Sequence, residues 1–539
     1  MKNRLAIFLS LGFFIACKQM PKRDDTAVFR YNESAGISSL DPAFARSQSN
    51  IWAVNQIFSG LVQMDNQLRI QPAIARSWEI MDSGKTYLFK LRQDIFFHQN
   101  ACFGPDSSRV VKASDFVYSF QRLISSELAS PGAWVFKNVA GFKALSDSVL
   151  EIRLAQAFSP FLGILSMKYC AVVPPEAIDF YGNEFSRNPV GTGPFQFKLW
   201  LENEKLILRR NPSYFEKDEV GEPLPYLEAV AISFVPDKQS AFLEFLKGKN
   251  DLISGLDLSY KDELLSPEGN LNPKYAQDFR LYRQAYLNTE YLAFYVDSAQ
   301  GRGAWQDVRI RQAINYGFDR VKMMRYLRNN IGEPALKGFI PKGLPSYDSL
   351  ADYGYSYQPE KARQLLVEAG FPQGKGLEEI SLQTNASYLD LCEYLQSELA
   401  KIGIRIKVEV SPPSTLRQAM ATGKVDFFRA SWIADYPDAE NYLSLFYGAN
   451  AAPNGPNYSH FASSYFDSLY VLSSAAVNDS IREKLYHQMD SLVISEAPIV
   501  PLFYDQVLRF YPKNIEGLEG NALNLLDLKK VRKLPEIKD

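Results

Sequence analysis

The chain is poor in the side chains that most often bind metals or form disulfides. Its 539 residues include three histidines and four cysteines. No HExxH pattern and no closely spaced set of His and Cys occurs, and a zinc site usually needs such a set. We therefore predict no metal site and no cofactor.

A surplus of one charge and the common catalytic motifs are lacking as well. The 59 Lys and Arg and 61 Asp and Glu leave a net charge of −2, which gives no basic footprint for nucleic acid. There is no GxSxG elbow and no phosphate-binding glycine loop. Asp and Glu are plentiful, but no pair stands at a spacing that indicates an extracellular hydrolase. We predict that the protein is not an enzyme.

Long apolar runs are absent, and the one apolar run near the N-terminus is short. Lys2 and Arg4 precede residues 5–16, which are mostly apolar, and Cys17 follows directly. A basic start, a short apolar core and a small residue before the cut mark a secretory signal. The run is too short to span a bilayer, which takes about 20 helical residues. The pattern resembles a bacterial lipoprotein signal, although Phe14 stands where leucine is usual.

This interpretation sets the expected place of the protein in the cell. We predict that residues 1–16 are a signal peptide, that Cys17 is lipidated, and that residues 17–26 form a tether. The protein would then lie in the cell envelope, on the periplasmic or extracellular face, anchored by lipid. Three cysteines remain besides Cys17, so at most one disulfide is possible, and we expect buried free thiols.

Hydrophobic periodicity predicts an α/β protein with small sheets covered by helices. The length favours two to four domains, at about 150 residues each. Predicted helices cover 51–60 (with Gly60 as its C-terminal cap), 113–124, 237–247, 308–327, 388–402 and 482–494. Predicted strands cover 27–31, 86–91, 206–208, 229–235, 380–384, 404–410, 426–430 and 499–504. Residues 380–410 read as one βαβ unit, whose two strands should be parallel.

Several further residues suggest structural roles. Gly191, Gly193 and Pro194 suit a tight backbone bend, because glycine tolerates positive φ and proline fixes its own φ. Trp78 and His98 are expected to pack in the interior, with His98 bonded to a backbone carbonyl.

Segments spread over most of the chain, from Leu40 to beyond Gly517, occur in a characteristic order. They include LDP at 40–42, FSGL at 58–61, PAIARSWE at 72–79, FKLR at 89–92, ASDFVYS at 113–119, PVGTGPF at 189–195, RNPSYF at 210–215, VRIRQAI at 308–314 and ARQLLVEAGF at 362–371. Together they resemble the family 5 extracellular solute-binding proteins of ABC importers, which serve dipeptides, oligopeptides and nickel.

This resemblance implies a two-lobed, periplasmic-binding-protein-like fold that encloses its ligand by closure. The first lobe would comprise residues 27–275 and 505–539, with an additional subdomain at about 60–190, and the second lobe residues 276–504. The expected function is capture of a short peptide for the transmembrane subunits of an ABC permease. The expected partners are that peptide, the permease and the membrane, reached through the N-terminal lipid. The protein is expected to be a monomer.

The stretch from Arg429 to Tyr436, RASWIADY, is similar to the one by which oligopeptide-binding members hold a peptide. The resemblance implies that Asp435 pairs with the ligand's α-ammonium and that the strand around Trp432 offers backbone hydrogen bonds. Arg429 would face a ligand carboxylate or brace the cleft. The predicted ligand-binding residues here are Arg429, Ser431, Trp432, Ile433 and Asp435. The alternative is that the stretch after Ala434 builds only a surface turn.

One departure from the family pattern bears on the ligand. Oligopeptide binders carry an acidic residue in the loop after the LDP motif, but this chain has Arg46, followed by Gln48. A positive charge there would favour a carboxylate or another anion. We include Arg46 and Gln48 among the predicted ligand-binding residues. A non-peptide ligand such as a nickel chelate, a haem or a small anion remains an alternative, as does a surface receptor of the same fold.

Overall fold

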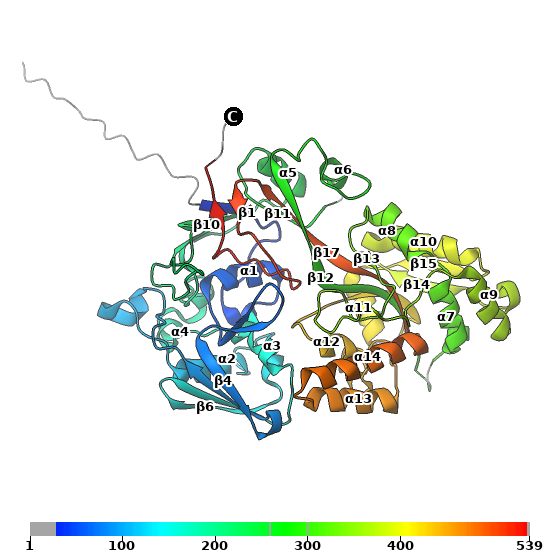
Figure 1. Ribbon diagram of the computed structural model, residues 1–539, viewed down its shortest axis with the longest axis horizontal. Helices are drawn as coiled ribbons and strands as arrows, with labels where there is room; N and C mark the ends of the chain where they lie inside the picture. Colours follow the sequence, from blue (N-terminus) through cyan, green and yellow to red (C-terminus); the bar gives the residue numbers. More distant parts are fainter. Residues whose placement is uncertain (1–27, 258–259, 298, 300, 536–539) are drawn as a thin grey trace, which may run out of the picture.

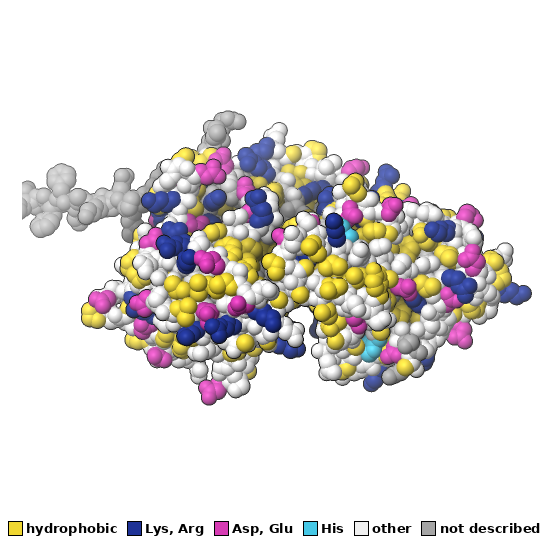
Figure 2. Space-filling view, turned by 60° about the horizontal axis from the view of Figure 1, so that its bottom comes forward, with side chains coloured by type: hydrophobic (Ala, Val, Ile, Leu, Met, Phe, Trp, Pro, Cys, Tyr) yellow, Lys and Arg dark blue, Asp and Glu magenta, His cyan; other side chains and the backbone are white. Residues whose placement is uncertain are grey.

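The computed structural model describes residues 28–257, 260–297, 299 and 301–535. The predicted signal peptide, Cys17 and the tether lie outside the described residues. Figure 1 shows two lobes joined by a pair of long strands, β12 (Phe279–Phe294) and β17 (Ile499–Pro512). Positive and negative side chains are interspersed on the face seen in Figure 2, in keeping with the near-zero net charge.

The N-terminal lobe, which holds the sheets built from β1 to β10, has two four-stranded sheets. The first has the order β1-β10-β9-β8 and the second the order β4-β5-β7-β6. Its strands are β1 (Val28–Asn32), β2 (Val62–Met64), β3 (Ile70–Pro72), β4 (Ala75–Met81), β5 (Thr86–Leu91), β6 (Val139–Ser146), β7 (Val149–Leu154), β8 (Phe195–Leu201), β9 (Lys205–Arg210) and β10 (Ala229–Ser233). Its helices are α1 (Gln48–Ile57), α2 (Ala113–Leu123), α3 (Phe161–Leu165) and α4 (Pro175–Tyr181).

The C-terminal lobe, which holds β13 to β16 and α7 to α14, is built on the largest sheet. The strand order is β11-β17-β12-β16-β14-β15, and β13 pairs with β17. The strands besides β12 and β17 are β11 (Ile253–Ser254), β13 (Glu333–Pro334), β14 (Ile380–Thr384), β15 (Ile406–Val410) and β16 (Phe427–Ile433). The helices are α7 (Val308–Tyr316), α8 (Arg320–Arg328), α9 (Pro359–Glu368), α10 (Leu389–Ala400), α11 (Pro413–Ala421), α12 (Glu440–Leu443), α13 (Ser464–Ala475) and α14 (Asp479–Glu496).

Strands β12 and β17 run antiparallel from one lobe into the other. They pair from Phe279 opposite Pro512 to Ala293 opposite Ile499, with a register shift between Ala285 and Thr289. Near the N-terminal lobe, β11 extends this pair, and α5 (Lys238–Leu246) and α6 (Lys261–Leu264) lie beside it. A short pair, β18 (Ile515–Glu516) and β19 (Arg532–Lys533), completes the C-terminal segment. The lobe boundaries predicted at 275 and 505 remain predictions.

The expected βαβ unit is confirmed in its strand direction. Strands β14 and β15 are parallel, with Ile380 opposite Ile406, and α10 connects them. The apolar residues of this unit form one core with those of α7 and α8, as the 3.6-residue period predicts. Among the described residues, no helix is both long enough and apolar enough to cross a bilayer.

Several predicted element boundaries are wrong, and four elements show this most clearly. The helix predicted at 308–327 is two helices, because Asp319 caps α8 by accepting hydrogen bonds from the N–H groups of Val321 (2.9 Å) and Lys322 (3.1 Å). Helix α1 begins at Gln48 and ends before Phe58, so Gly60 is not its cap. Strands β16 and β17 extend beyond their predicted ends, where cross-strand pairing with β12 continues.

The predicted packing of His98 is confirmed. Its ring is buried, with Nε2 2.9 Å from the carbonyl oxygen of Gly193 and Nδ1 3.3 Å from the N–H of Gly191. These contacts fit a neutral ring with the proton on Nε2. Burial lowers the pKa of His98 to about 4. Trp78 packs against the core of the N-terminal lobe, and Cys102, Cys170 and Cys392 are free thiols, of which Cys102 is only half-buried.

The glycines at 191 and 193 have a different role from the predicted bend. Neither has a positive φ. A Cβ on Gly191 would lie 2.1 Å from the carbonyl oxygen of Ile57, and one on Gly193 would lie 2.5 Å from the carbonyl carbon of the same residue. The N–H of Gly193 also donates to the Ile57 oxygen at 2.8 Å. The glycines are therefore required for close contact with the C-terminus of α1.

This contact predicts the effect of an added methyl group. We expect Gly191→Ala to lower the free energy of unfolding by about 1–3 kcal/mol, because the backbone of α1 would have to move. Thermal melting of the purified protein measures the change. Gly141→Ala is the matched control, since a Cβ there meets nothing within 4 Å, and surface changes of this kind stay within about 0.5 kcal/mol. Equal midpoints for the two variants would contradict the role assigned to Gly191.

Candidate functional site

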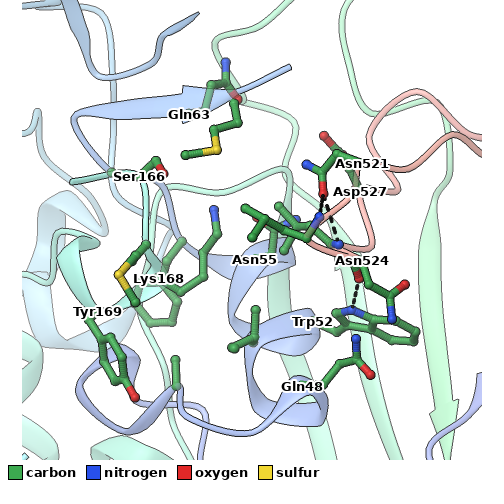
Figure 3. Close-up of a pocket in the computed structure, with 18 of the residues that line it drawn as sticks. Gln48, Trp52, Asn55, Gln63, Ser166, Lys168, Tyr169, Asn521, Asn524 and Asp527 are labelled. Atoms are coloured by element: carbon green, nitrogen blue, oxygen red, sulfur yellow. Dashed lines mark hydrogen bonds between the residues drawn. The ribbon is translucent and has the colours of Figure 1, made fainter. Parts of the chain in front are cut away.

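A cavity of about 740 Å³ lies where the two lobes meet. Its volume falls in the range of small-molecule sites, roughly 300–1,000 Å³. Most of the wall belongs to α1 with the loop before it, strand β2, the segment 166–169 and the segment 521–529, and the C-terminal lobe adds Tyr286 and residues 433–435. Figure 3 shows the part of the wall formed by α1, the 166–169 segment and the 521–529 segment.

Helix α1 holds the 521–529 segment in place by side-chain donors. The indole N–H of Trp52 donates to the carbonyl oxygen of Asn524 at 2.8 Å (Figure 3). The side-chain amides of Asn55 and Gln56 both donate to the carbonyl oxygen of Leu526, at 2.9 and 2.7 Å. An irregular segment has no ladder partners of its own, so these bonds satisfy buried carbonyls that would otherwise be unpaired.

Arg509 fixes the same segment from the other side. Its buried guanidinium, on β17, donates to the carbonyl oxygens of Glu519 (3.0 Å) and Leu525 (3.1 Å) and to Oδ1 of Asn524 (3.1 Å). Burial lowers the pKa of Arg509 to about 10. Arg509 therefore attaches this part of the cavity wall to strand β17.

Four of the seven residues predicted to bind ligand line this cavity. They are Arg46, Gln48, Ile433 and Asp435. Arg46 precedes α1 and Gln48 begins it in the N-terminal lobe, whereas Ile433 ends β16 and Asp435 follows it in the C-terminal lobe. The structure thus brings together two segments that lie almost 400 residues apart in the sequence. Their role as ligand contacts remains a prediction.

Asp435 lines the cavity. The N–H of Asp435 donates to Oδ1 of Asn441 at 3.2 Å, which orients the turn. Partial burial raises the pKa of the Asp435 carboxyl group, whereas a hydrogen bond with the Asn441 side chain lowers it. No cation among the described residues contributes to this pKa shift. Tyr169 lies within electrostatic range of both Asp435 and Arg46, because each shifts its pKa. A ligand that enters between the lobes would therefore meet groups of both signs.

Strand β16 ends beside the cavity with one edge open. On one side, Arg429 to Ile433 pair with Leu292 to Asn288 of β12. On the other side, β14 reaches β16 only at the pair Gln383 and Phe428 in the described part of the chain. Beyond Phe428 the backbone on that side has no strand partner among the described residues. An extended peptide can pair with such an edge.

Arg429, Ser431 and Trp432 do not line the cavity. Arg429 is buried, forms an ion pair with Glu290 and lies over the Tyr388 ring, with its guanidinium carbon 3.3 Å from the ring centroid. The Trp432 indole donates to Oδ1 of Asn441 at 2.8 Å. Of the two roles predicted for Arg429, facing a ligand carboxylate or bracing the cleft, the buried pair with Glu290 favours the second, and the role itself remains a prediction. Ser431 lies opposite Glu290 on β12.

Sequence reasoning missed several residues of the wall and one that supports it. Asn55, Lys168, Asp527 and Lys529 line the cavity, and Arg509 holds the 521–529 segment from β17; all are single polar residues outside any motif. Lys529 is the best connected: its ammonium lies 2.9 Å from Oε2 of Glu216 and 3.5 Å from Oδ2 of Asp527. Nothing in the local sequence distinguishes these residues from surface lysines, asparagines and acids.

The ion pair of Arg429 leads to a stability prediction. Removal of one member of a buried pair leaves an uncompensated charge, which costs about 3–5 kcal/mol. We expect Arg429→Met to lower the melting temperature by that mechanism, and the double variant Arg429→Met/Glu290→Gln to recover most of the loss. Thermal melting of the apo protein measures both. An unchanged melting temperature together with weaker ligand binding would instead place Arg429 in ligand recognition.

Two lobes with a cavity between them are the architecture of periplasmic binding proteins, and comparisons with known proteins place this chain among them. The family model "Bacterial extracellular solute-binding proteins, family 5 Middle" matches residues 69–454. The chain therefore belongs to family 5 of the bacterial extracellular solute-binding proteins, as the sequence motifs predicted. Proteins of this family bind solutes for ABC transporters and are not enzymes.

Individual relatives differ in what their names say they bind. Heme-binding protein A of Haemophilus influenzae is 28% identical over 83% of this chain and 81% of its own length. Glutathione-binding protein GsiB of Salmonella typhi is 23% identical over 90% of both chains. Among solved structures, DppA of Helicobacter pylori in complex with the peptide STSA has a TM-score of 0.73 at 25% identity, covering 94% of this chain and 98% of that chain. HbpA2 of Haemophilus parasuis has a TM-score of 0.82 at 22% identity, with coverage of 94% and 100%.

Proposed function

We propose that this protein captures short peptides outside the cytoplasm and delivers them to an ABC importer, while a lipid on Cys17 holds it at the membrane. The observation that carries the proposal is the placement of Asp435. Its carboxylate is open to the cavity, follows the free edge of β16, and has no cationic partner among the described residues that shifts its pKa.

Both features match the chemistry of a peptide. The α-ammonium of a peptide has three hydrogen-bond donors, and its positive charge would give the Asp435 carboxylate a partner of opposite sign. A charge-assisted hydrogen bond of this kind contributes about 1.5–3 kcal/mol. The edge of β16 offers main-chain groups, which bind a peptide backbone without regard to its side chains. The solved structure of DppA with a bound peptide supports this choice of ligand class.

A second candidate is a compact anionic ligand that is not a peptide. Arg46 supports this alternative, because it lines the cavity and is exposed. Relatives named for haem and glutathione show that the family is not restricted to one ligand class. Glutathione is itself a small peptide with two carboxylates, so it falls within the first proposal.

Native mass spectrometry separates the two candidates. The chain from Lys18 onward is expressed in a bacterial host and purified without denaturant. A set of bound masses that fragment as short peptides is the expected result. A single bound mass that contains no amino acids would overturn the peptide proposal and favour the second candidate.

Removal of the Asp435 charge tests the ammonium contact. We expect Asp435→Asn to weaken binding of the co-purified peptides by about tenfold or more, the loss of one charge-assisted bond, while the melting temperature of the apo protein hardly changes. Calorimetric titration with a peptide identified by mass spectrometry measures the affinity. Asp106→Asn, at an exposed position outside the cavity wall, is the matched control. Equal affinity of the Asp435 variant and the wild type would exclude the contact.

The lipid anchor is tested separately. We expect Cys17→Ala to move the full-length protein from the membrane fraction to the soluble fraction, because no thioether-linked lipid can form without the thiol. Immunoblots of fractionated cells measure the distribution, with Cys102→Ala as the control. If the Cys17 variant still sediments with membranes, the lipoprotein interpretation is wrong.

A further inference from the structure

We propose that Lys168 is a specificity residue whose ammonium binds a carboxylate of the peptide ligand against the wall of the N-terminal lobe. The inference rests on the proposed function and extends it to the ligand's anionic end. It assigns the two lobes to opposite charges of the ligand: Asp435 of the C-terminal lobe to the ammonium, and Lys168 of the N-terminal lobe to the carboxylate.

The position of Lys168 is the first support. It lies in the 166–169 segment of the cavity wall and is half-buried. In Figure 3 its side chain extends from that segment into the space bordered by Ser166, Asn55 and Gln63. All three neighbours carry neutral polar side chains, which can donate to or accept from a bound carboxylate but cannot neutralise an ammonium.

The other lysine of this wall already has partners within the protein. Lys529 lies 2.9 Å from a carboxylate oxygen of Glu216 and 3.5 Å from one of Asp527, and it donates to Gln63 at 2.9 Å. Glu216 also accepts from the Tyr214 hydroxyl at 2.8 Å. Of the two lysines on this wall, Lys529 is therefore satisfied by the protein. Asp527 attracts Lys168 only through space, and Lys529 repels it.

Keeping the Lys168 ammonium charged in this partly buried position costs free energy as long as no anion is bound beside it. Burial lowers the pKa of Lys168 to about 8, and no hydrogen bond from the described residues counteracts it. A protein that used Lys168 only for structure would gain from pairing it, as it does for Lys529. A ligand carboxylate would supply the missing partner, and closure of the cavity would strengthen the attraction by excluding water.

A competition between charged and neutral peptides tests the inference. The wild type is incubated with an equimolar library of tripeptides, each present as the free acid and as the C-terminal amide, with Glu and Gln among the variable residues. Bound peptides are eluted after rapid desalting and quantified by mass spectrometry. If the C-terminal carboxylate is the one bound, we expect free acids to be enriched about tenfold or more over the matching amides. If a side-chain carboxylate is bound instead, peptides with Glu should be enriched to the same degree over those with Gln.

Three variants assign the preference to Lys168. Lys168→Met keeps the length of the side chain and removes its charge, so it should bring the enrichment close to one. Lys168→Arg keeps the charge and should retain most of the enrichment. Lys198→Met, at an exposed lysine of β8 outside the cavity wall, should behave as the wild type. Circular dichroism melting confirms that each variant is folded.

The dependence on pH provides a readout that a merely structural role would not give. The enrichment requires the ammonium form, so it should be complete on the acidic side of the pKa of about 8 and fall as the pH rises through it. We would measure it between about pH 6.5 and about pH 9.5. In Lys168→Arg the enrichment should stay constant over this range, because the guanidinium does not titrate there.

The outcomes separate the two proposals. Two results would overturn the role of Lys168 while leaving the peptide function intact. In one, the wild type retains peptides with a carboxylate and their neutral counterparts in equal amounts; in the other, Lys168→Met keeps the full preference of the wild type. Retention of no peptide in any form would overturn the proposed function itself, and the inference with it.

Discussion

The antiparallel pairing of β12 with β17 is the constraint on which the rest of the structure depends. These two strands belong to the largest sheet, yet their residues contribute to the hydrophobic cores of both lobes: Tyr282 and Tyr511 pack in the N-terminal lobe, and Leu292 and Val500 in the C-terminal lobe. The register shift between Ala285 and Thr289 lies near the middle of the pair. Bulges of this kind bend and twist a ladder locally, so the relative orientation of the lobes is encoded in a few residues.

The cavity follows from that arrangement. Strand β12 pairs with β16 on the edge opposite β17 and so carries the turn with Asp435 to the boundary between the lobes. Strand β17 carries Arg509, which fixes the 521–529 segment against α1. Each wall of the site is thus attached to one of the two strands that join the lobes. Movement of one lobe relative to the other would change the distance between Asp435 and the residues of α1 and of the 521–529 segment that line the cavity.

Sequence reasoning succeeded where a pattern repeats and failed where a single residue acts through tertiary contacts. The unit of β14, α10 and β15 was predictable because its apolar residues recur with the helical and strand periods. The break between α7 and α8 was missed because the apolar period continues in phase across it. The break shows only in the caps: α7 ends at Tyr316, and Asp319 starts α8 as its N-cap. Gly191 and Gly193 were recognised as special, but only the structure shows that Ile57 is the reason.

The same distinction applies to the site. Arg46 and Asp435 were found because the family resemblance marks their positions, and both line the cavity. Arg429 stood in the same motif, yet its partner Glu290 lies on a neighbouring strand that no local pattern identifies. Lys168 and Lys529 are indistinguishable in sequence, and only their neighbours show that one is paired within the protein and the other is open to the cavity.

The hydrogen bonds from Trp52 and Asn55 to the 521–529 segment join parts of the chain more than 460 residues apart. During synthesis α1 emerges early, but this part of the cavity wall emerges almost last. A nascent chain can form the sheets of both lobes before its recognition surface exists. Ligand binding is therefore a property of the finished molecule, because residues 521–529 supply both a part of the cavity wall and the buried Leu526 and Leu528 of the N-terminal lobe's core.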